Sequence, residues 1–287
     1  MADEPRAGEE TSTFSAADKL RNSSAADRKA VEQQSRPNAV LIHETIRAEG
    51  ESELEREVHA LLLSGFAAGL SMGLSLIAEG LLRTHLPDAP WRDLVTHLGY
   101  TVGFLVVVLG RQQLFTENTL TPILPLLHHR NGATLGRVLR LWAAVLVANV
   151  VATWLIAAAI AHTEVFTPEA KTAFLEISRK TIAHPFWTTV LKAVFAGWLI
   201  ALMVWLLPAA ETGRPAVILI VTYVVALGEF AHIVAGSVDA FYLVASGAAS
   251  YGDYAWKFFV PTLLGNVVGG VALVAVLNYG QVAPEID

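Results

Sequence analysis

Cysteine is absent from this chain of 287 residues, so neither a disulfide bridge nor a thiolate metal site can form. Charge is scarce, because only 16% of the residues are Asp, Glu, Lys or Arg, against about 25% in soluble domains. The net charge is −6 and the sequence holds no basic block, which argues against nucleic acid as a partner. The N-terminal region also lacks an apolar segment of the signal-peptide kind, so we expect no cleaved signal peptide.

Hydrophobic residues make up 54% of the chain, and the mean hydropathy is +0.49. The charges are segregated, because residues 1–57 hold 13 of the 26 acidic residues and 8 of the 20 Lys and Arg. The rest of the chain therefore carries 13 acids and 12 bases over 230 residues. This composition predicts a polytopic membrane protein whose surroundings are the lipid bilayer.

The chain divides into three predicted regions. Residues 1–37 are rich in Ala, Ser and Glu and poor in aromatic residues, so we expect a disordered polar tail. Residues 38–57 alternate charged and apolar positions, which suits an amphipathic helix at the membrane surface or, equally, a solvated leader helix. Residues 58–281 hold six hydrophobic segments and are predicted to form the transmembrane domain.

A bilayer-spanning helix needs about 20 apolar residues, and each of the six segments meets this length. Polar residues interrupt the second segment near 110–119 and the fifth near His232. An even number of spans places both termini on one side, and the acidic tail favours the cytoplasm, although Lys and Arg are almost evenly divided between the two sides. The predicted spans are 58–82, 94–127, 138–161, 185–207, 216–244 and 258–277.

The two halves of the chain repeat at an offset of 117 residues. Phe115 in the first interruption corresponds to His232 in the second, and the sequence ANVVA at 148–152 corresponds to GNVVG at 265–269. Each half reads as helix, broken helix, helix, and three spans per half give the halves opposite orientations. Inverted repeats with discontinuous helices are a recurring design of transport proteins. We therefore predict an all-α membrane protein with six transmembrane helices and broken second and fifth helices.

His232 lies inside the second interruption. Non-helical backbone is tolerated at membrane depth only where it is buried in protein or lines an aqueous cavity, and half-helix N-termini can hold an anion there. An imidazole, which titrates near about pH 6.5, could give a proton to a weak acid, which then crosses apolar surroundings without charge. The alternative is a core histidine bonded to a neighbouring backbone carbonyl.

The first interruption contains the sequence LFTENT. Leu114 and Phe115 are candidates for an apolar constriction, with Thr116 as the adjacent hydroxyl, and ordinary helix packing is the alternative for both. An ionised Glu117 would repel anions, so we expect it to be protonated, paired with a base, or turned away from the route. Six further histidines near span ends are interpreted as interfacial: His85, His97, His128, His129, His162 and His184.

The sequence offers no nucleophile with its base, no phosphate-binding loop and no metal-ligand spacing. We therefore expect neither an enzyme nor a cofactor or metal site.

Four stretches resemble signatures of the formate/nitrite transporter family. They are GFAAGLSMGLSL (65–76), LFTENTLTPILP (114–125), ALGEFAHIVAGSVDAF (226–241) and PTLLGNVVGG (261–270). The likeness covers about residues 55–280. The FTENT variant and the long polar tail are more similar to a YfdC-like branch than to the formate or nitrite channels proper.

The resemblance implies an aquaporin-like protomer in a homopentamer of the inner membrane, with one pore per protomer. Small monovalent weak-acid anions such as formate or nitrite would pass, often with a proton. His232 falls on the family's central histidine, and Val225 on a constriction position that is Phe in formate channels. The loop that forms the other constriction would be Leu114, Phe115 and Thr116, followed by Glu117 and Asn118.

The sequence also departs from the family pattern. Ala231 replaces the Glu that precedes the histidine, with Glu229 two residues earlier, and Gly236 replaces an Asn. Lys180 is the nearest candidate for the family's vestibule lysine, although it comes several residues early. The leading interpretation is an anion channel or proton-coupled transporter. The alternatives are a channel for a small neutral solute and a non-conducting membrane scaffold whose tail binds a partner.

Overall fold

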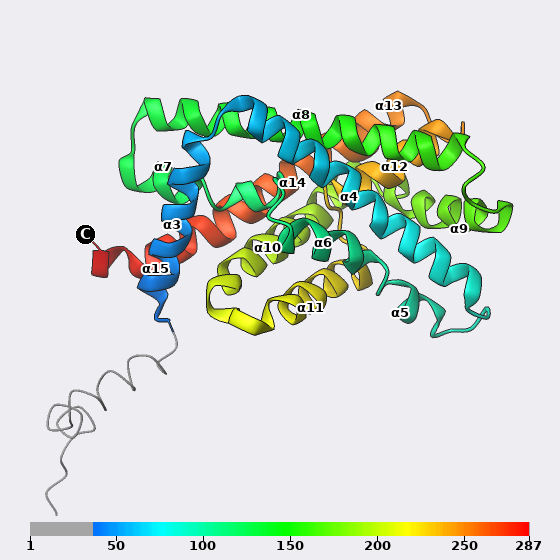
Figure 1. Ribbon diagram of the computed structural model, residues 1–287, viewed down its shortest axis with the longest axis horizontal. Coiled ribbons are helices and arrows are strands. Elements are labelled where there is room, and N and C mark those ends of the chain that lie inside the picture. The colour runs from blue at the N-terminus through cyan, green and yellow to red at the C-terminus, as the bar shows by residue number, and fades with distance from the viewer. Residues whose placement is uncertain (1–36, 287) are drawn as a thin grey trace, which may run out of the picture. The chain divides into compact units, whose positions relative to one another are not determined.

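The computed structural model describes residues 37–286, and helices with short connections account for this part of the chain (Figure 1). The predicted tail, 1–37, lies outside the described residues except for Pro37. Two halves follow each other, and each consists of a surface helix, a long helix, an interrupted helix and a second long helix. The surface helix of the second half is an element that the sequence interpretation did not identify.

The first half runs from Ala39 to His162. Asn38 caps its first helix by accepting a hydrogen bond from the Leu41 amide, and Asn131 caps its last helix in the same way. The elements are α3 Ala39–Glu55, α4 Val58–His85, α5 Arg92–Thr96, α6 Tyr100–Leu109, η1 Glu117–Thr119, α7 Ile123–His129 and α8 Gly132–His162.

The second half begins at Pro168, which follows the capping residue Thr167. Its last span is one continuous helical stretch with two π-helical turns. The elements are α9 Pro168–Arg179, η2 Lys180–Ile182, α10 Phe186–Ala210, η3 Glu211–Gly213, α11 Arg214–Leu227, α12 Ala235–Ala245, α13 Tyr251–Asp253, η4 Tyr254–Phe259, α14 Val260–Gly270, η5 Val271–Val276 and α15 Leu277–Ile286.

Within residues 37–286, five helical stretches are long and apolar enough to cross a membrane. One of them, Phe186–Leu227, contains both α10 and α11. The chain turns from α10 to α11 at Glu211, where φ is +40°. The shorter apolar helix α12 completes the interrupted fifth span. The architecture therefore agrees with the predicted six spans, of which the second and fifth are broken.

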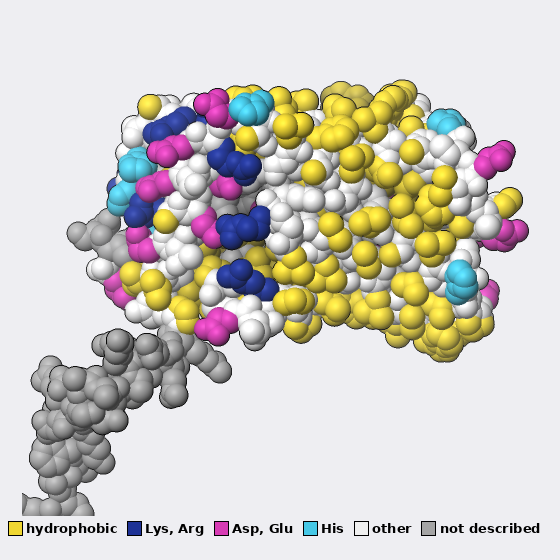
Figure 2. All heavy atoms as spheres, viewed as in Figure 1, with side chains coloured by type: hydrophobic (Ala, Val, Ile, Leu, Met, Phe, Trp, Pro, Cys, Tyr) yellow, Lys and Arg dark blue, Asp and Glu magenta, His cyan; other side chains and the backbone are white. Residues whose placement is uncertain are grey.

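The surface supports this membrane arrangement. Figure 2 shows hydrophobic side chains over the middle of the molecule and charged side chains gathered toward the two ends. Large apolar side chains exposed on the spans include Leu63, Val147, Trp187, Leu191, Ile220 and Leu264. Their exposure is what a lipid environment requires, so the chain is a multi-pass membrane protein.

Close helix packing follows the small residues. Gly65, Gly69 and Gly73 of α4 face α8, where an added Cβ would meet Ala148, Ala152 and Ile156 in turn. This is the close approach that the glycine spacing predicts. In the second half, α10 and α14 pack in the same manner through Gly197, Gly265 and Gly269.

The surface helices α3 and α9 each bury one face against the spans. In α3 the buried residues are His43, Ile46, Gly50 and Leu54, and Gly50 fits closely against the backbone of Thr121 in the first interruption. Helix α9 buries Ala170, Ala173, Phe174 and Ser178, and it packs against α4 and α12. Each interrupted helix thus has a surface helix beside one of its ends.

Candidate functional site

The two interruptions, 110–122 and 228–234, begin with the same backbone turn. Gly110 and Gly228 cap the C-terminal ends of the half-helices α6 and α11. The next residues, Arg111 and Glu229, have left-handed backbones with φ of +50° and +48°. Left-handed residues other than glycine are uncommon and concentrate at functional sites. One further hydrogen bond closes each turn, from Gln112 N to Val107 O and from Phe230 N to Val225 O, both 3.0 Å.

A buried asparagine holds the first interruption in place. The Oδ1 atom of Asn149 on α8 accepts a hydrogen bond from the Phe115 amide at 3.0 Å. Its Nδ2 atom donates to the carbonyls of Gly65 and Gln113 at 2.7 and 3.0 Å. The bonds to Phe115 and Gln113 satisfy backbone groups that neither a helix nor water would satisfy at this depth.

A second asparagine does the same for the other interruption. Asn266 on α14 accepts from the Ile233 amide at 2.8 Å and donates to the carbonyls of Ala193 and Ala231 at 2.8 and 2.9 Å. Both asparagines are fully buried. The internal repeat found in the sequence is therefore a repeat of the scaffold that positions the two interruptions.

The register of the repeat needs one correction. The two asparagines are 117 residues apart, but the amides that they bind, Phe115 and Ile233, are 118 apart. The first half has one more residue between its interruption and its asparagine. The structural counterpart of His232 is consequently Leu114, and the pairing of Phe115 with His232 at the constant sequence offset is wrong.

His232 joins the two interruptions. Its Nε2 atom lies 2.7 Å from Thr116 Oγ1, and its Nδ1 atom accepts a hydrogen bond from the Ala235 amide at 3.1 Å. An Nδ1 atom that accepts carries no proton, so the ring is neutral and its Nε2–H donates to Thr116. Phe104 packs edge-on against the imidazole with ring centroids 4.9 Å apart. These partners differ from the backbone carbonyl expected of an ordinary core histidine.

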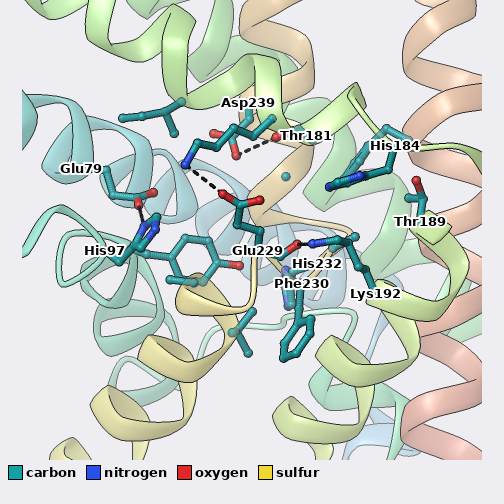
Figure 3. A pocket seen from close by; sticks show the side chains of 18 residues that line it. Glu79, His97, Thr181, His184, Thr189, Lys192, Glu229, Phe230, His232 and Asp239 are labelled. Carbon is teal, nitrogen blue, oxygen red and sulfur yellow. Dashed lines mark hydrogen bonds and ion pairs between the residues drawn. The ribbon is translucent and has the colours of Figure 1, made fainter. Parts of the chain in front are cut away.

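On one side of His232 lies a cavity of about 90 Å³, which we name the Lys192 cavity (Figure 3). Side chains from α4, α6, α10, η2, α12 and the second interruption converge on it. Val225 and the buried His232 belong to its lining. Its ionisable side chains are Glu79, His97, Tyr100, Lys180, His184, Lys192, Glu229, His232 and Asp239.

Lys192 is the cation of this cavity that has no carboxylate partner among the described residues. Its Nζ donates to the carbonyls of Gly228 and Glu229 at 3.1 and 3.3 Å, at the end of half-helix α11. The sequence interpretation missed Lys192. A single ionisable residue inside an apolar span is itself a functional signal, and this signal was available in the fourth span.

Lys180 reaches the same cavity but is neutralised there. Its Nζ lies 2.9 Å from Glu229 Oε1 and 3.4 Å from Asp93 Oδ2. Burial lowers the pKa of the Lys180 ammonium, but the ion pairs with Glu229 and Asp93 outweigh burial and hold the pKa above its ordinary value. Lys180 therefore stays charged and is paired with Glu229 on the interruption.

Two further acids of the Lys192 cavity have partners of their own. His97 Nδ1 lies 2.9 Å from Glu79 Oε1 in a hydrogen bond, and Thr181 Oγ1 donates to Asp239 Oδ2 at 3.4 Å. His97 and His184 were interpreted as interfacial, yet both face this cavity, as Figure 3 shows. The ionisable groups of the cavity are thus mostly matched in charge.

On the other side lies a larger cavity of about 210 Å³, which we name the Glu117 cavity. It is enclosed by α3, the first interruption, α10 and α11. Its polar side chains are Thr45, Glu49, Glu53, Arg111, Gln112, Gln113, Glu117, Asn118, Thr121 and Arg214.

A chain of hydrogen bonds runs along the wall of the Glu117 cavity. Gln113 donates to Glu53 Oε2 at 2.7 Å, Asn118 donates to Gln113 at 2.9 Å, and Thr121 donates to Asn118 at 3.3 Å. Glu117 stands apart from this chain, because its Oε1 atom is buried without a hydrogen-bond partner. Pairing with a base, one of the three possibilities considered for Glu117, does not occur among the described residues.

Buried side chains separate the two cavities. Leu114 and Thr116 are buried and belong to the lining of neither cavity. The Phe115 ring packs edge-on against Trp142 of α8, at a centroid distance of 5.7 Å, which is the packing alternative considered for it. Thr116 links the two cavities, because it contacts His232 of the Lys192 cavity and directly precedes Glu117 of the Glu117 cavity. The buried Phe104 ring packs on His232, and the buried Leu114 follows Gln113 of the Glu117 cavity. We refer to Leu114, Thr116 and Phe104 as the partition.

The described residues contain no group of three or more His, Asp or Glu placed to hold a metal ion. The arrangement is that of two small polar cavities separated by an apolar partition, with one imidazole and one hydroxyl in contact across it. Such an arrangement suits passage of a small solute.

Comparison with known proteins identifies the family. The formate/nitrite transporter family model matches residues 40–280. The chain is 42% identical over 249 residues to the inner membrane protein YfdC of Escherichia coli strain K12, across 87% of this chain and 80% of that protein. It is 26% identical over 239 residues to the formate channel BtFdhC of Bacillus thuringiensis, across 81% of this chain and 91% of that protein.

Solved structures share the fold. A pentameric formate channel with formate bound matches with a TM-score of 0.67 at 18% identity, over 79% of this chain and 98% of that chain. An FNT family ion channel matches with a TM-score of 0.66, also at 18% identity, over 84% and 98%. The chain therefore belongs to the formate/nitrite transporter family, as its motifs indicated, and it is a membrane transport protein rather than an enzyme.

Proposed function

We propose that the chain carries a small monovalent weak-acid anion, of the formate or nitrite kind, across the membrane together with a proton. The observation that carries this proposal is the contact of His232 with Thr116 between two polar cavities. The names of the related formate channels agree with this class of solute. We also propose a homopentamer in the inner membrane on the basis of the same relatives. We propose cytoplasmic termini on the basis of the even number of spans and the acidic N-terminal tail.

Lys192 supplies the attraction for an anion in the proposed route. The other cations of its cavity are matched by acids, whereas Lys192 binds only backbone carbonyls. A charge held in a cavity with apolar walls acts on an ion more strongly than it would in water. Lys192 therefore draws an anion toward the end of α11, close to His232.

His232 neutralises the anion by giving it a proton. A bare anion between Leu114 and Phe104 would lose its hydration, which costs far more than moving the neutral acid through the same place. In the proposed cycle the imidazole takes a second proton at Nδ1 from hydronium in the Lys192 cavity, which breaks the bond to the Ala235 amide. The imidazolium then gives the Nε2 proton to the anion, and the Thr116 hydroxyl binds the neutral acid in its place.

A second function is favoured by the hydrogen bonds themselves. The neutral ring of His232, fixed by Thr116 and Ala235, suits a channel for a neutral solute in which the histidine only donates a hydrogen bond. Flux of such a solute would depend on neither pH nor membrane potential. This difference separates the two proposals.

The test is uptake into proteoliposomes by the wild-type protein and by His232→Asn, across about pH 5 to 8, where a free histidine titrates. Formate, nitrite, acetate and urea are measured side by side. We expect monoanion flux that rises toward acid pH and falls at least about tenfold in the variant, a barrier change of about 1.4 kcal/mol. Urea flux alone, unchanged by pH, would replace the proposal with the neutral-solute channel. No flux of any solute would favour the scaffold.

A further inference from the structure

Glu117 lines the Glu117 cavity, and one of its carboxyl oxygens has no hydrogen-bond partner. It lies in the first interruption, one residue after the hydroxyl that contacts His232, and it lines the Glu117 cavity. Its Oε1 atom is buried and has no hydrogen-bond partner. A buried polar group without a partner destabilises a fold by about 1–3 kcal/mol, so a role in folding does not account for this side chain.

The other acids of the cavity show the contrast. Glu49 is 3.1 Å from Arg111 in an ion pair, and Glu53 accepts a hydrogen bond from Gln113 at 2.7 Å. Both belong to the surface helix α3, whereas Glu117 belongs to the interruption itself. Of the three carboxyl groups around the cavity, Glu117 is thus the one free to exchange a proton with a solute.

The two cavities differ in the ionisable side chain that each has near the apolar partition. The Lys192 cavity has His232 in its lining, and the Glu117 cavity has Glu117. A weak acid that must be neutral between Leu114 and Phe104 needs a proton donor on whichever side it enters. His232 cannot serve both sides, because it lines only the Lys192 cavity.

We propose that Glu117 is the proton-exchanging group for solutes that enter the partition from the Glu117 cavity. This inference rests on the proposed function. The O–H bond of the Glu117 carboxyl breaks, an O–H bond forms on the anion, and the neutral acid moves past Thr116. The carboxylate then takes its next proton from hydronium in the solvent that enters through the cavity. For solutes arriving from the other side the same step runs in reverse.

The charges around Glu117 suit this exchange. Arg111 and Arg214 bring positive charge to the cavity, and Glu49 and Glu53 on α3 bring negative charge. The remaining wall is apolar on α10 and α11, at Val204, Leu207 and Ile218. A carboxyl group and a small weak acid have similar proton affinities in water, which is the condition for transfer in both directions.

The experiment compares wild type with Glu117→Gln and Glu117→Asp in right-side-out and inside-out membrane vesicles, with formate and nitrite as probes. Flux that starts from the Glu117 side should rise toward acid pH on that side in the wild type. In Glu117→Gln we expect this flux to fall about tenfold near neutral pH and to lose that rise, whereas Glu117→Asp should restore the rise. Flux from the Lys192 side should keep its pH response through His232, which shows that the variant is folded.

Glu55→Gln is the matched control, because Glu55 is an exposed acid at the end of α3 that lines neither cavity. An unchanged pH response of Glu117→Gln from the Glu117 side would overturn the inference. A loss of flux in Glu117→Asp as large as the loss in Glu117→Gln would also overturn it, because the side chain would then be structural. Absence of formate and nitrite flux in the wild type would instead reject the proposed function.

Discussion

The two halves of the molecule share a backbone and differ in the side chains that meet it. Ser64 on α4 and Lys192 on α10 each directly precede the residue whose carbonyl is bound by the asparagine of that half. The Ser64 hydroxyl accepts a hydrogen bond from the Gln113 amide in the first interruption. The Lys192 ammonium donates to the carbonyls of Gly228 and Glu229 in the second. One position in a repeated scaffold thus places a neutral group on the first interruption and a cation, which lines the Lys192 cavity, on the second.

The comparison shows where the two halves are constrained alike and where they have diverged. The asparagines that bind an amide of each interruption are the same in both halves, because an unsatisfied amide at membrane depth is costly in either half. The side chains that line the Lys192 cavity differ from those that line the Glu117 cavity, because a solute passes one cavity after the other. The following predictions test each side of this distinction.

The largest effect is expected at the asparagines. Asn149→Ala and Asn266→Ala each remove three hydrogen bonds of buried backbone groups, and each lost partner costs about 1–3 kcal/mol. Both variants should lower the unfolding temperature in detergent strongly and to a similar degree. Asn131→Ala, which removes a helix cap at the surface, should cost only about 1 kcal/mol. If either core variant were as stable as Asn131→Ala, the equivalence of the halves would fail.

The next effect concerns the contact between the interruptions. Thr116→Val keeps the shape of the side chain and removes the hydroxyl that binds His232 at 2.7 Å. We expect solute flux to fall about tenfold, because neither the imidazole nor a passing acid then has its partner. Thr116→Ser should retain most of the flux in the same proteoliposome assay. A Val variant with wild-type flux would mean that the two interruptions act independently.

A smaller effect is expected from exchanging the residue that distinguishes the halves. Lys192→Ser gives the second half the residue type of the first and removes a cation without an acidic partner. Anion uptake at low solute concentration should fall by about fivefold, equivalent to about 1 kcal/mol, with a higher half-saturation concentration. Lys257→Met, which changes a lysine paired with Asp253, is the control. Uptake that is equal in both variants would remove Lys192 from the route.

The smallest effect involves the surface helix of the first half. Burial lowers the pKa of His43 from its usual value of 6.5, although Glu44 beside it acts in the opposite direction. Below about pH 6.5 the unfolded chain therefore binds a proton at this histidine that the folded chain does not bind. The free energy of unfolding declines as the pH falls through this range. His43→Phe should lessen this decline, as measured by unfolding temperature against pH. The second half has no such residue in α9, so variants there should not change the slope.

The spans and both interruptions could be predicted from the sequence, because apolar run length and its interruption by polar residues are local signals. Helix α9 was missed although Ala170, Ala173 and Phe174 have helical spacing after the capping Thr167. His232 could be found because an ionisable residue inside a span is rarely neutral to function. Applied evenly, the same rule would have drawn attention to Glu79 and Lys192.

Other features could not be predicted, because they depend on contacts between distant segments. The pairing of Lys180 with Glu229 joins residues 49 positions apart and depends on the left-handed backbone at Glu229. The orientation of Phe115 toward Trp142 depends on the packing of the first interruption against α8. A constant offset between the repeats also hides the single extra residue of the first half, which only the asparagine contacts reveal.

That extra residue has a consequence for protein design. A designer who wished to give this fold two imidazoles related by its internal symmetry would use the sequence offset of 117 residues and would therefore replace Phe115. In the backbone, however, position 114 is the equivalent of position 232, since the amides bound by the two asparagines are 118 residues apart. Leu114→His would therefore create the symmetric site, whereas a histidine at 115 would replace a ring that packs on Trp142.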